Sequence, residues 1–373
     1  MKIGILTHYY KSGNYGGNLQ AWALCTAIKS LGYDAEQIAY HNKPTGNVNK
    51  LQRMTVMFKT KIKQFRFLAN RNIAKRKSFI KEFNQSVIPH SKDVYTKSTI
   101  ENCKKNYDVF VTGSDQVWHP QAVCDAYLLK FADSDKVKLS YAASVAHDEL
   151  TEAEKNRYKS AFADYKAISV REENAIELLQ DLSPVKIQWV LDPTLLISKE
   201  EWLEIATDYR IEDKYLFCFF LGDDVRQREL SKEYAEKKGL KIVTLPHLNG
   251  YKKCDKLFGD YQLYDVDPRR LISIVNNAEC IFTDSFHMTV FSLILQKQHF
   301  VFQRSGAKSM SSRIYSLISM FDTASHFCDD DSKVTYEYID GVEKIDYSVK
   351  FEKYEKMKAR SIEFLKNNIA IKE

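Results

Sequence analysis

Short apolar runs alternate with amphipathic stretches along most of this chain. Residues 2–7 (KIGILT) form an apolar run typical of a buried strand. Turn-forming residues follow at 12–17. The apolar positions of 18–31 then recur at helical spacing, and Gly32 is placed to end that helix. Further strands are predicted at 108–112, 138–144, 167–170, 186–190, 215–221, 241–245, 279–283 and 299–303. Further helices are predicted at 151–165, 172–182, 199–209, 227–238, 268–276, 287–295, 311–320 and 349–368.

The alternation of strand and helix predicts parallel sheets with helices on both faces, because parallel neighbours need a crossover connection. A chain of 373 residues, at about 150 residues per domain, indicates two such units. We therefore expect an α/β protein of two doubly wound domains, 1–208 and 209–345. Residues 346–373 would form a helix that packs back on the N-terminal domain.

Residues 50–81 differ from the rest of the chain in charge. The segment holds 11 Lys and Arg residues, and no acidic residue occurs between Glu36 and Glu82. Its apolar residues fall on one helical face, which predicts a basic amphipathic helix. These residues are Phe58, Ile62, Phe65 and Ile73.

Composition and charge exclude several classes of protein. Hydrophobic residues at 44% and charged residues at 28% exclude a disordered or collagen-like chain. The net charge of +6 is too small to indicate a partner, and no nucleic-acid recognition motif accompanies 50–81. The seven cysteines have no metal-type spacing, which favours a reducing compartment. No uncharged apolar run reaches the ~20 residues that span a bilayer, and residues 1–10 are too short for a signal peptide. We expect a cytoplasmic protein.

Ligands of open parallel sheets bind at the carboxyl ends of the strands, so the residues that follow each strand are the candidates for a site. The loop after the first strand contains Asn14, Gly17 and Asn18. Its backbone N–H groups, with the helix that follows, suit an anion. The loop lacks the dinucleotide-binding fingerprint, and a tight turn without a ligand is an equal alternative.

Several polar residues and a tryptophan follow the strand at 108–112. They are Ser114, Asp115, Gln116 and Trp118. Together they suit a polar ring, with hydrogen bonds from the first three and an apolar face from Trp118. The alternative is a turn stabilised by its own side chains, with Trp118 in the core. Arg171 follows the strand at 167–170, where it either clamps a carboxylate or phosphate or pairs with a neighbouring acid.

The strand at 279–283 ends in Asp284-Ser285-Phe286-His287, followed by an apolar helix. His287 falls in the first turn, where the helix dipole disfavours an imidazolium and favours a bound anion. A neutral His beside an anion is a candidate general acid–base, and Ser285 is placed to cap the helix. The alternative is a packing His. Arg304 and Arg313 follow and add positive charge to the same cleft or lie on the surface.

Six short motifs occur in one order along the chain. They are NYGGNLQ at 14–20, GSDQVW at 113–118, YAAS at 141–144, SVRE at 169–172, LDPTL at 191–195 and TDSFH at 283–287. Together they resemble the polysaccharide pyruvyl transferase family, over residues 1–320. The resemblance implies two Rossmann-like domains in the arrangement of the GT-B glycosyltransferases. It also implies transfer of pyruvate from phosphoenolpyruvate to a saccharide as a ketal, in making cell-surface polysaccharides and without a metal or other cofactor.

The resemblance also implies roles for individual residues. In characterised relatives an Arg after a first-domain strand and an Arg-Leu-His group contact phosphoenolpyruvate. Arg171 resembles the first and His287 matches the His, for which proton transfer is expected. This chain has Ser285-Phe286 where those relatives have Arg-Leu, so either Arg304 or Lys308 substitutes for the missing cation, or the donor is held differently.

Two other functions fit the same residues. One is a glycosyltransferase of this fold that uses a sugar nucleotide, and the other is a non-catalytic sugar-binding relative. The segment 50–81 has three interpretations. It packs its apolar face on the first domain, it lies against a membrane that carries a lipid-linked acceptor, or its cations line the sugar cleft.

Overall fold

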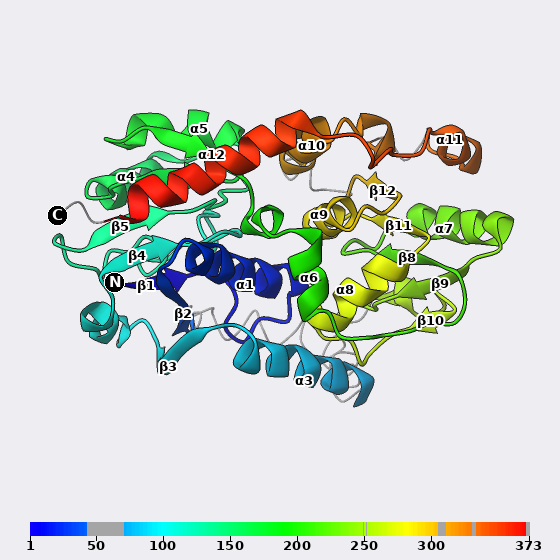
Figure 1. Cartoon of the computed structure of the whole chain (residues 1–373), viewed down its shortest axis with the longest axis horizontal. Helices are drawn as coiled ribbons and strands as arrows, with labels where there is room; N and C mark the ends of the chain where they lie inside the picture. Colours follow the sequence, from blue (N-terminus) through cyan, green and yellow to red (C-terminus); the bar gives the residue numbers. More distant parts are fainter. Residues whose placement is uncertain (43–70, 249, 251, 305–310, 330–332, 371–373) are drawn as a thin grey trace, which may run out of the picture.

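The structure is a computed structural model and describes residues 1–42, 71–248, 250, 252–304, 311–329 and 333–370. Two parallel sheets dominate the chain, one in each half (Figure 1). The N-terminal sheet has the order β3-β2-β1-β4-β5. Its strands are β1 (Lys2–Leu6), β2 (Asp34–Tyr40), β3 (His90–Tyr95), β4 (Val109–Thr112) and β5 (Val137–Ser140). A bridge between Leu139 and Ala167 joins β5 to the pair β6 (Ile168–Val170) and β7 (Ile187–Trp189).

The C-terminal sheet has the order β10-β9-β8-β11-β12-β13. Its strands are β8 (Tyr215–Phe219), β9 (Lys241–Thr244), β10 (Tyr261–Gln262), β11 (Cys280–Thr283), β12 (His299–Phe302) and β13 (Phe327–Cys328). All of its pairings are parallel. The predicted fold class, two doubly wound α/β units, is confirmed. The expected domain limits at 208 and 345 stay a prediction, although the two sheets do lie on either side of residue 208.

Helices cover both sheets in the described part of the chain (Figure 1). Those of the first half are α1 (Tyr15–Ser30), α3 (Arg71–Ser86), α4 (Glu152–Phe162), α5 (Asn174–Leu179) and α6 (Lys199–Ile205). Those of the second half are α7 (Val225–Lys238), α8 (Pro268–Asn277), α9 (Phe286–Ile294), α10 (Ser311–Met320), α11 (Tyr336–Gly341) and α12 (Glu352–Ile369). Residues at the helix ends explain several boundaries. Thr151 and Ser198 each form a reciprocal capping box, and Gly239 ends α7 in the left-handed conformation at φ 64°.

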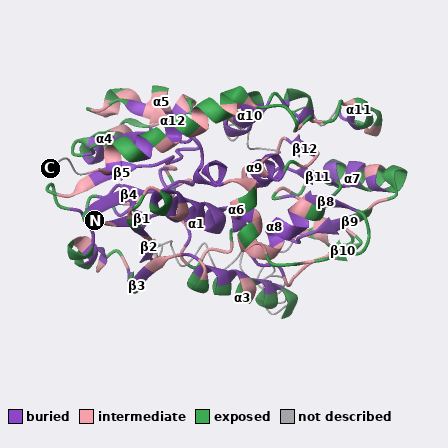
Figure 2. Cartoon of the chain, viewed as in Figure 1, coloured by how far each residue is buried: buried purple, intermediate pink, exposed green. Residues whose placement is uncertain are grey.

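The two halves share one buried apolar cluster. Trp202 of α6 contacts Trp22 of α1 and Phe291 of α9, with ring centroids 4.9 Å apart in both pairs. The strands and α1 are largely buried, as the purple segments of Figure 2 show. Tyr15 donates a hydrogen bond to the Val266 carbonyl across the same boundary, at 2.7 Å. The interface between the halves is therefore a packed core, which fixes how the strand ends of the two sheets face each other.

Helix α12 crosses from the second half back onto the first (Figure 1). The Leu191 backbone N–H donates to the Ser361 hydroxyl at 2.9 Å, and the Tyr354 hydroxyl donates to the Leu195 carbonyl at 2.9 Å. Phe364 is buried, and the centroid of its ring lies 6.3 Å from that of Tyr141. The helix predicted at 349–368 thus forms and packs against the N-terminal sheet.

The basic segment divides into two parts, because residues 50–70 lie outside the described residues. Residues 71–81 belong to α3, whose apolar residues Ile73, Ile80 and Phe83 are buried. For this part the packing interpretation is confirmed. The exception is Arg76, which is 3% exposed and donates across the interface to the carbonyls of Pro246 and Leu263. Burial lowers the pKa of Arg76.

Arg76→Met should lower the free energy of unfolding by about 1–3 kcal/mol, because it leaves two buried carbonyls without a donor. Urea titration of the full chain measures the effect. Lys77→Met on the exposed face of the same helix is the control and should be neutral. Equal midpoints for both variants would contradict the bridging role of Arg76.

Four strands escaped the sequence pattern, β2, β3, β10 and β13. The sequence of β3 (HSKDVY) is mostly polar because it lies at the sheet edge with exposed side chains.

No helix in the described part of the chain has the length and apolar character needed to cross a bilayer.

Candidate functional site

A cavity of about 250 Å³ lies where the switch points of the two sheets face each other. The strand order reverses between β1 and β4 in one sheet and between β8 and β11 in the other, and ligands of such sheets bind at that crevice. The cavity is lined by residues that follow these strands and β12, and by the start of α10. They are Asn14, Asp115, Gln116, Leu221, Asp284, Ser285, Phe286, His287, Gln303, Arg304, Arg313 and Ile314.

His287 reaches from the C-terminal half into the N-terminal half. Its Nε2 lies 3.7 Å from Asp192 Oδ2, and its ring rests against the first turn of α1. A Cβ atom placed on Gly16 would lie only 2.2 Å from His287 Nδ1. The imidazole thus occupies the space that a side chain at position 16 would need, so only glycine fits there.

Asp192 joins His287 to Arg171. Its carboxylate accepts from Arg171 Nη1 at 3.1 Å and from the Ser114 hydroxyl at 2.8 Å, and its side chain is fully buried. Burial alone would raise the pKa of Asp192, but the nearby His287 and the charge of Arg171 outweigh it and hold the pKa well below its ordinary value. The structure thus brings the two predicted residues, Arg171 and His287, to one carboxylate.

Arg171 lies behind the cavity wall. Its side chain is 1% exposed, and the ring of Phe286 lies 4.9 Å from its guanidinium carbon. Arg171 Nε is 3.5 Å from Glu172, the neighbouring acid that the sequence offered as its alternative partner. Burial opposes the charge, but Glu172, Asp192 and Asp115 together raise the pKa of Arg171.

Arg313 is the buried cation on the cavity wall itself. Its side chain is 5% exposed, and its Nε lies 3.8 Å from Glu172 Oε1. Burial and the nearby charge of Arg171 lower the pKa of Arg313 to about 10. The guanidinium carbon is also 5.8 Å from the Phe286 ring. An anion in the cavity would relieve this electrostatic cost.

Arg304 also lines the cavity but already has an acidic partner. Its Nε lies 3.3 Å from Asp284 Oδ2, and its Nη2 donates to the Asp284 carbonyl at 3.0 Å. Lys308, the other substitute considered from sequence, lies outside the described residues. Among the described residues, Arg304 and Arg313 are therefore the two candidates for the cation that replaces the missing Arg.

The remaining predicted residues divide between the cavity and the core. Asn14, Asp115, Gln116, Ser285 and Phe286 line the cavity. Asp115 has φ 73°, a left-handed conformation that Asp tolerates better than most residues and that often occurs at functional sites. Its pKa is lowered, since Arg171, His287 and His8 outweigh the opposing effect of burial.

Gly17, Asn18, Ser114 and Trp118 are supporting residues, away from the cavity lining. Trp118 is fully buried and its indole N–H donates to the Tyr127 carbonyl. Trp118 therefore packs in the core, which was the alternative interpretation of its position. Asn18 donates to the Ser12 and Asn14 carbonyls and holds the loop before α1. A Cβ on Gly17 would lie 2.8 Å from the His8 carbonyl oxygen, so Gly17 allows a close approach of backbone.

Two helices begin at the cavity without a side-chain cap. Asn14 and Ser285 occupy the N-cap positions of α1 and α9, yet neither side chain accepts from its helix. By contrast, Asp224 and Asp267 accept from the first turns of α7 and α8. The predicted position of Ser285 is right, but the expected cap hydrogen bond is absent. Backbone N–H groups of α1 and α9 are thus left for a ligand.

Sequence reasoning did not select Asp192, Gly16 or Arg313 as site residues. Asp192 and Gly16 fall inside recognised motifs, LDPTL and NYGGNLQ, which was the available signal. Their roles depend on contacts between the halves of the chain, which no local pattern encodes. The sequence indicated that Arg313 adds charge to the cleft or lies on the surface, but it did not indicate that its side chain is buried.

Acid should destabilise the protein through Asp192 and Asp115. Both have a pKa that is lower in the folded state than in the unfolded state. Their contribution to the free energy of unfolding is therefore complete above the ordinary Asp pKa of about 3.9 and is lost as the pH falls below that value. Melting temperature measured between pH 7 and pH 3 should fall most steeply at the acid end. Asp192→Asn should flatten this slope, and the exposed Asp181→Asn should not.

One cluster of metal-ligand type lies apart from these residues, in the described part of the second half. One ligand atom each of His247, Cys254 and Asp255 lies within 4.8 Å of the others. Direct hydrogen bonds already engage the Asp255 carboxylate, including one from His247 Nδ1 at 2.9 Å. We therefore assign no metal to it.

Solved structures with the same architecture place the protein in a fold class. A putative UDP-N-acetylglucosamine 2-epimerase from Listeria monocytogenes has a TM-score of 0.55 at 12% identity, over 99% of this chain and 94% of that one. The UDP-GlcNAc 2-epimerase of Methanocaldococcus jannaschii has a TM-score of 0.54 at 14% identity, over 98% and 100% of the chains. The fold is therefore the GT-B-type arrangement of two Rossmann-like domains, as expected. A search of curated proteins found no match.

The sequence itself identifies the family. A family model described as polysaccharide pyruvyl transferase matches residues 14–306, which include every motif from NYGGNLQ to TDSFH. The chain belongs to the polysaccharide pyruvyl transferase family, and the resemblance noted from its motifs is confirmed. Membership supports a transferase of polysaccharide biosynthesis with a saccharide acceptor.

Proposed function

We propose that this protein transfers pyruvate from phosphoenolpyruvate to two hydroxyl groups of a saccharide, forming a ketal, with the cavity between the halves as the donor site. Phosphoenolpyruvate carries a phosphate and a carboxylate, so its site needs several N–H donors in a confined space. The proposal takes its chemistry from the family and its residues from the cavity.

One observation supports an anionic donor most strongly. Among the described residues, seven buried side-chain nitrogen atoms have no hydrogen-bond partner, and four of them lie in one group: Arg171 Nε and Nη2, Arg313 Nε and His287 Nε2. The other three are Arg76 Nε, Arg228 Nε and His299 Nε2. Buried donors are normally paired, and an unpaired one costs about 1–3 kcal/mol. The four donors of this group lie around Phe286, whose ring contacts the guanidinium groups of Arg171 and Arg313. A bound dianion would supply acceptors to Arg313 and His287, which line the cavity.

The reaction balances without a further reactant. One acceptor hydroxyl adds to C2 of phosphoenolpyruvate while C3 gains a proton and becomes a methyl group. The second hydroxyl then forms the other C–O bond at C2 as the C–O bond to phosphate breaks. Of the two hydroxyl protons, one replaces the proton delivered to C3 and the other leaves with the phosphate. His287 is the proposed proton donor to C3, and ionised Asp115, which also lines the cavity, is proposed to accept a hydrogen bond from the saccharide.

The first test is phosphate release from phosphoenolpyruvate in the presence of candidate saccharide acceptors, with the ketal product identified by mass spectrometry. The expected result is one phosphate per pyruvate transferred. Release of UDP from a sugar nucleotide, with no phosphate from phosphoenolpyruvate, would instead show a glycosyltransferase and reject the proposal.

The second test is donor binding by calorimetry in the absence of acceptor. Arg313→Gln should weaken phosphoenolpyruvate binding by about 10- to 100-fold, since a charge-assisted hydrogen bond contributes about 1.5–3 kcal/mol. Arg210→Gln is the matched control, because Arg210 is exposed and pairs only with the nearby Asp208 in the described structure. Unchanged binding in Arg313→Gln would remove Arg313 from the donor site.

We also propose that the exposed cations of α3 bring the protein to an anionic membrane surface carrying a lipid-linked acceptor. Lys75, Lys77 and Lys81 are exposed, whereas the apolar face of α3 is buried. Contact would therefore be electrostatic, with about 1 kcal/mol per cation, and weaken with salt. Co-sedimentation with anionic vesicles should fall when these three residues become Gln, and absence of binding at low salt would reject the contact.

A further inference from the structure

The loop after β8 forms part of the cavity wall and is held from the cavity side by Asp284. The backbone N–H groups of Leu221 and Gly222 donate to the two oxygens of the Asp284 carboxylate, each at 2.7 Å. The same carboxylate and the Asp284 carbonyl hold Arg304. The position of Leu221 thus helps to set the position of Asp284 and Arg304, both of which line the cavity.

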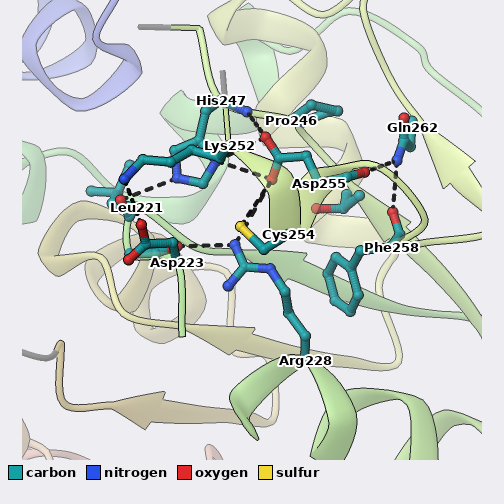
Figure 3. A network of polar contacts seen from close by, with 12 residues as sticks. Leu221, Asp223, Arg228, Pro246, His247, Lys252, Cys254, Asp255, Phe258 and Gln262 are labelled. Atoms are coloured by element: carbon teal, nitrogen blue, oxygen red, sulfur yellow. Dashed lines mark hydrogen bonds and ion pairs between the residues drawn. The ribbon is translucent and has the colours of Figure 1, made fainter. Parts of the chain in front are cut away.

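The far side of this loop is held by His247 (Figure 3). His247 Nε2 lies 3.1 Å from the Leu221 carbonyl oxygen, and Nδ1 lies 2.9 and 3.0 Å from the two oxygens of Asp255. A carbonyl oxygen and an ionised carboxylate only accept hydrogen bonds. Both ring nitrogens must therefore carry a proton for both contacts to form, which makes His247 an imidazolium.

A second cation supports the same loop. Arg228 is 5% exposed, and its Nη2 donates to the Gly222 carbonyl at 2.9 Å and lies 3.9 Å from Asp255 Oδ1. The carbonyls of Leu221 and Gly222 are thus held by two cations that share one carboxylate. Asp255 is the centre of this arrangement, and its pKa is lowered because hydrogen bonding from His247 outweighs the effect of burial.

We propose that His247, held as an imidazolium by Asp255, is a positioning residue for the cavity. It anchors the Leu221 carbonyl, and through Leu221 and Asp284 it fixes the wall that carries Arg304. The part of this inference that concerns substrate rests on the proposed function. The part that concerns the loop does not, because it follows from the hydrogen bonds alone.

The first experiment measures the loop directly, by hydrogen exchange of the Leu221 and Gly222 amides in the full-length protein. His247→Ala should speed their exchange at least tenfold at neutral pH. His90→Gln in the other half is the control. Unchanged exchange in His247→Ala would overturn the proposal whether or not phosphoenolpyruvate is the donor.

The second experiment separates positioning from a general structural effect by using phosphoenolpyruvate kinetics. His247→Ala should raise KM for phosphoenolpyruvate by about 3- to 30-fold with kcat changed less than threefold. The double variant His247→Gln with Asp255→Asn forms a neutral hydrogen-bonded pair, so it should recover most of the lost affinity. An equal loss of kcat in His247→Ala, or no recovery of affinity in the double variant, would overturn the positioning role.

Zinc binding provides a third check. One equivalent of Zn²⁺ bound by the wild type and lost in Cys254→Ser would also overturn the proposal, because Nδ1 of His247 would then be a ligand and not a proton donor. We expect no stoichiometric binding. If the wild type releases no phosphate from phosphoenolpyruvate, the proposed function fails while the exchange experiment still decides the role of His247.

Discussion

Turnover should fall by about 10²- to 10⁴-fold when His287 is replaced by Gln, the range expected for loss of a general acid or base. Gln keeps a polar side chain near Asp192 but cannot deliver a proton to C3. Phosphate release from phosphoenolpyruvate, measured with saturating donor and acceptor, gives the effect on kcat. Donor affinity should change much less, because Arg313 and the N-termini of α1 and α9 remain.

The matched control for this variant is another partly buried histidine. His90→Gln should retain full turnover, since His90 bonds only to the Ile88 carbonyl among its described contacts. Near-normal turnover in a folded His287→Gln protein would assign His287 to packing between the halves. A melting temperature equal to that of the wild type is required before either result is interpreted.

Gly16→Ala should lower turnover by about 10²-fold, the cost that misplacing a catalytic group by about 1 Å can have. The new Cβ would lie 2.2 Å from His287 Nδ1, whereas ordinary contacts begin at 3.4 Å, so the imidazole or the first turn of α1 must move. The same displacement disturbs the contact between His287 and Asp192. Both kcat and the melting temperature should therefore fall.

Gly13→Ala is the control for this loop. Its Cβ would lie 3.7 Å from Leu248, an ordinary contact, so turnover should stay close to the wild-type value. The pair isolates the effect of one methyl group beside His287 from any general effect of stiffening the loop. Equal activity in Gly16→Ala and Gly13→Ala would contradict the close contact of α1 with His287.

The fold was predictable because most inner strands of the two sheets, such as β1, β4, β8 and β11, are short apolar runs. The inner strand β2 (DAEQIAY) was missed because polar residues interrupt it. Edge strands lack that signal, so β3 was missed and β10 and β13, with two residues each, left no pattern. Helix α1 begins at Tyr15, three residues before the predicted start, because the Gly-rich turn itself becomes helical against the other half of the chain.

The site was predictable only in part, for a physical reason. Parallel strands place their carboxyl ends on one edge, which is why Asp115 and His287 were found from the sequence. Which other side chains lie between two such residues depends on tertiary packing, which the sequence pattern does not encode. Phe286 was expected to touch the substrate, but it also covers Arg171, and Trp118 packs in the core instead of the cavity.

The return of α12 to the N-terminal half has a consequence for synthesis of the protein. The Leu191 N–H and the Leu195 carbonyl find their partners on α12 more than 150 residues later in the chain. At about 5–20 residues per second, the ribosome needs on the order of 10–40 s to pass from one to the other. During that interval the face of the first domain around Tyr141 stays uncovered and open to other chains. The first domain is therefore completed only after the ribosome has synthesised α12.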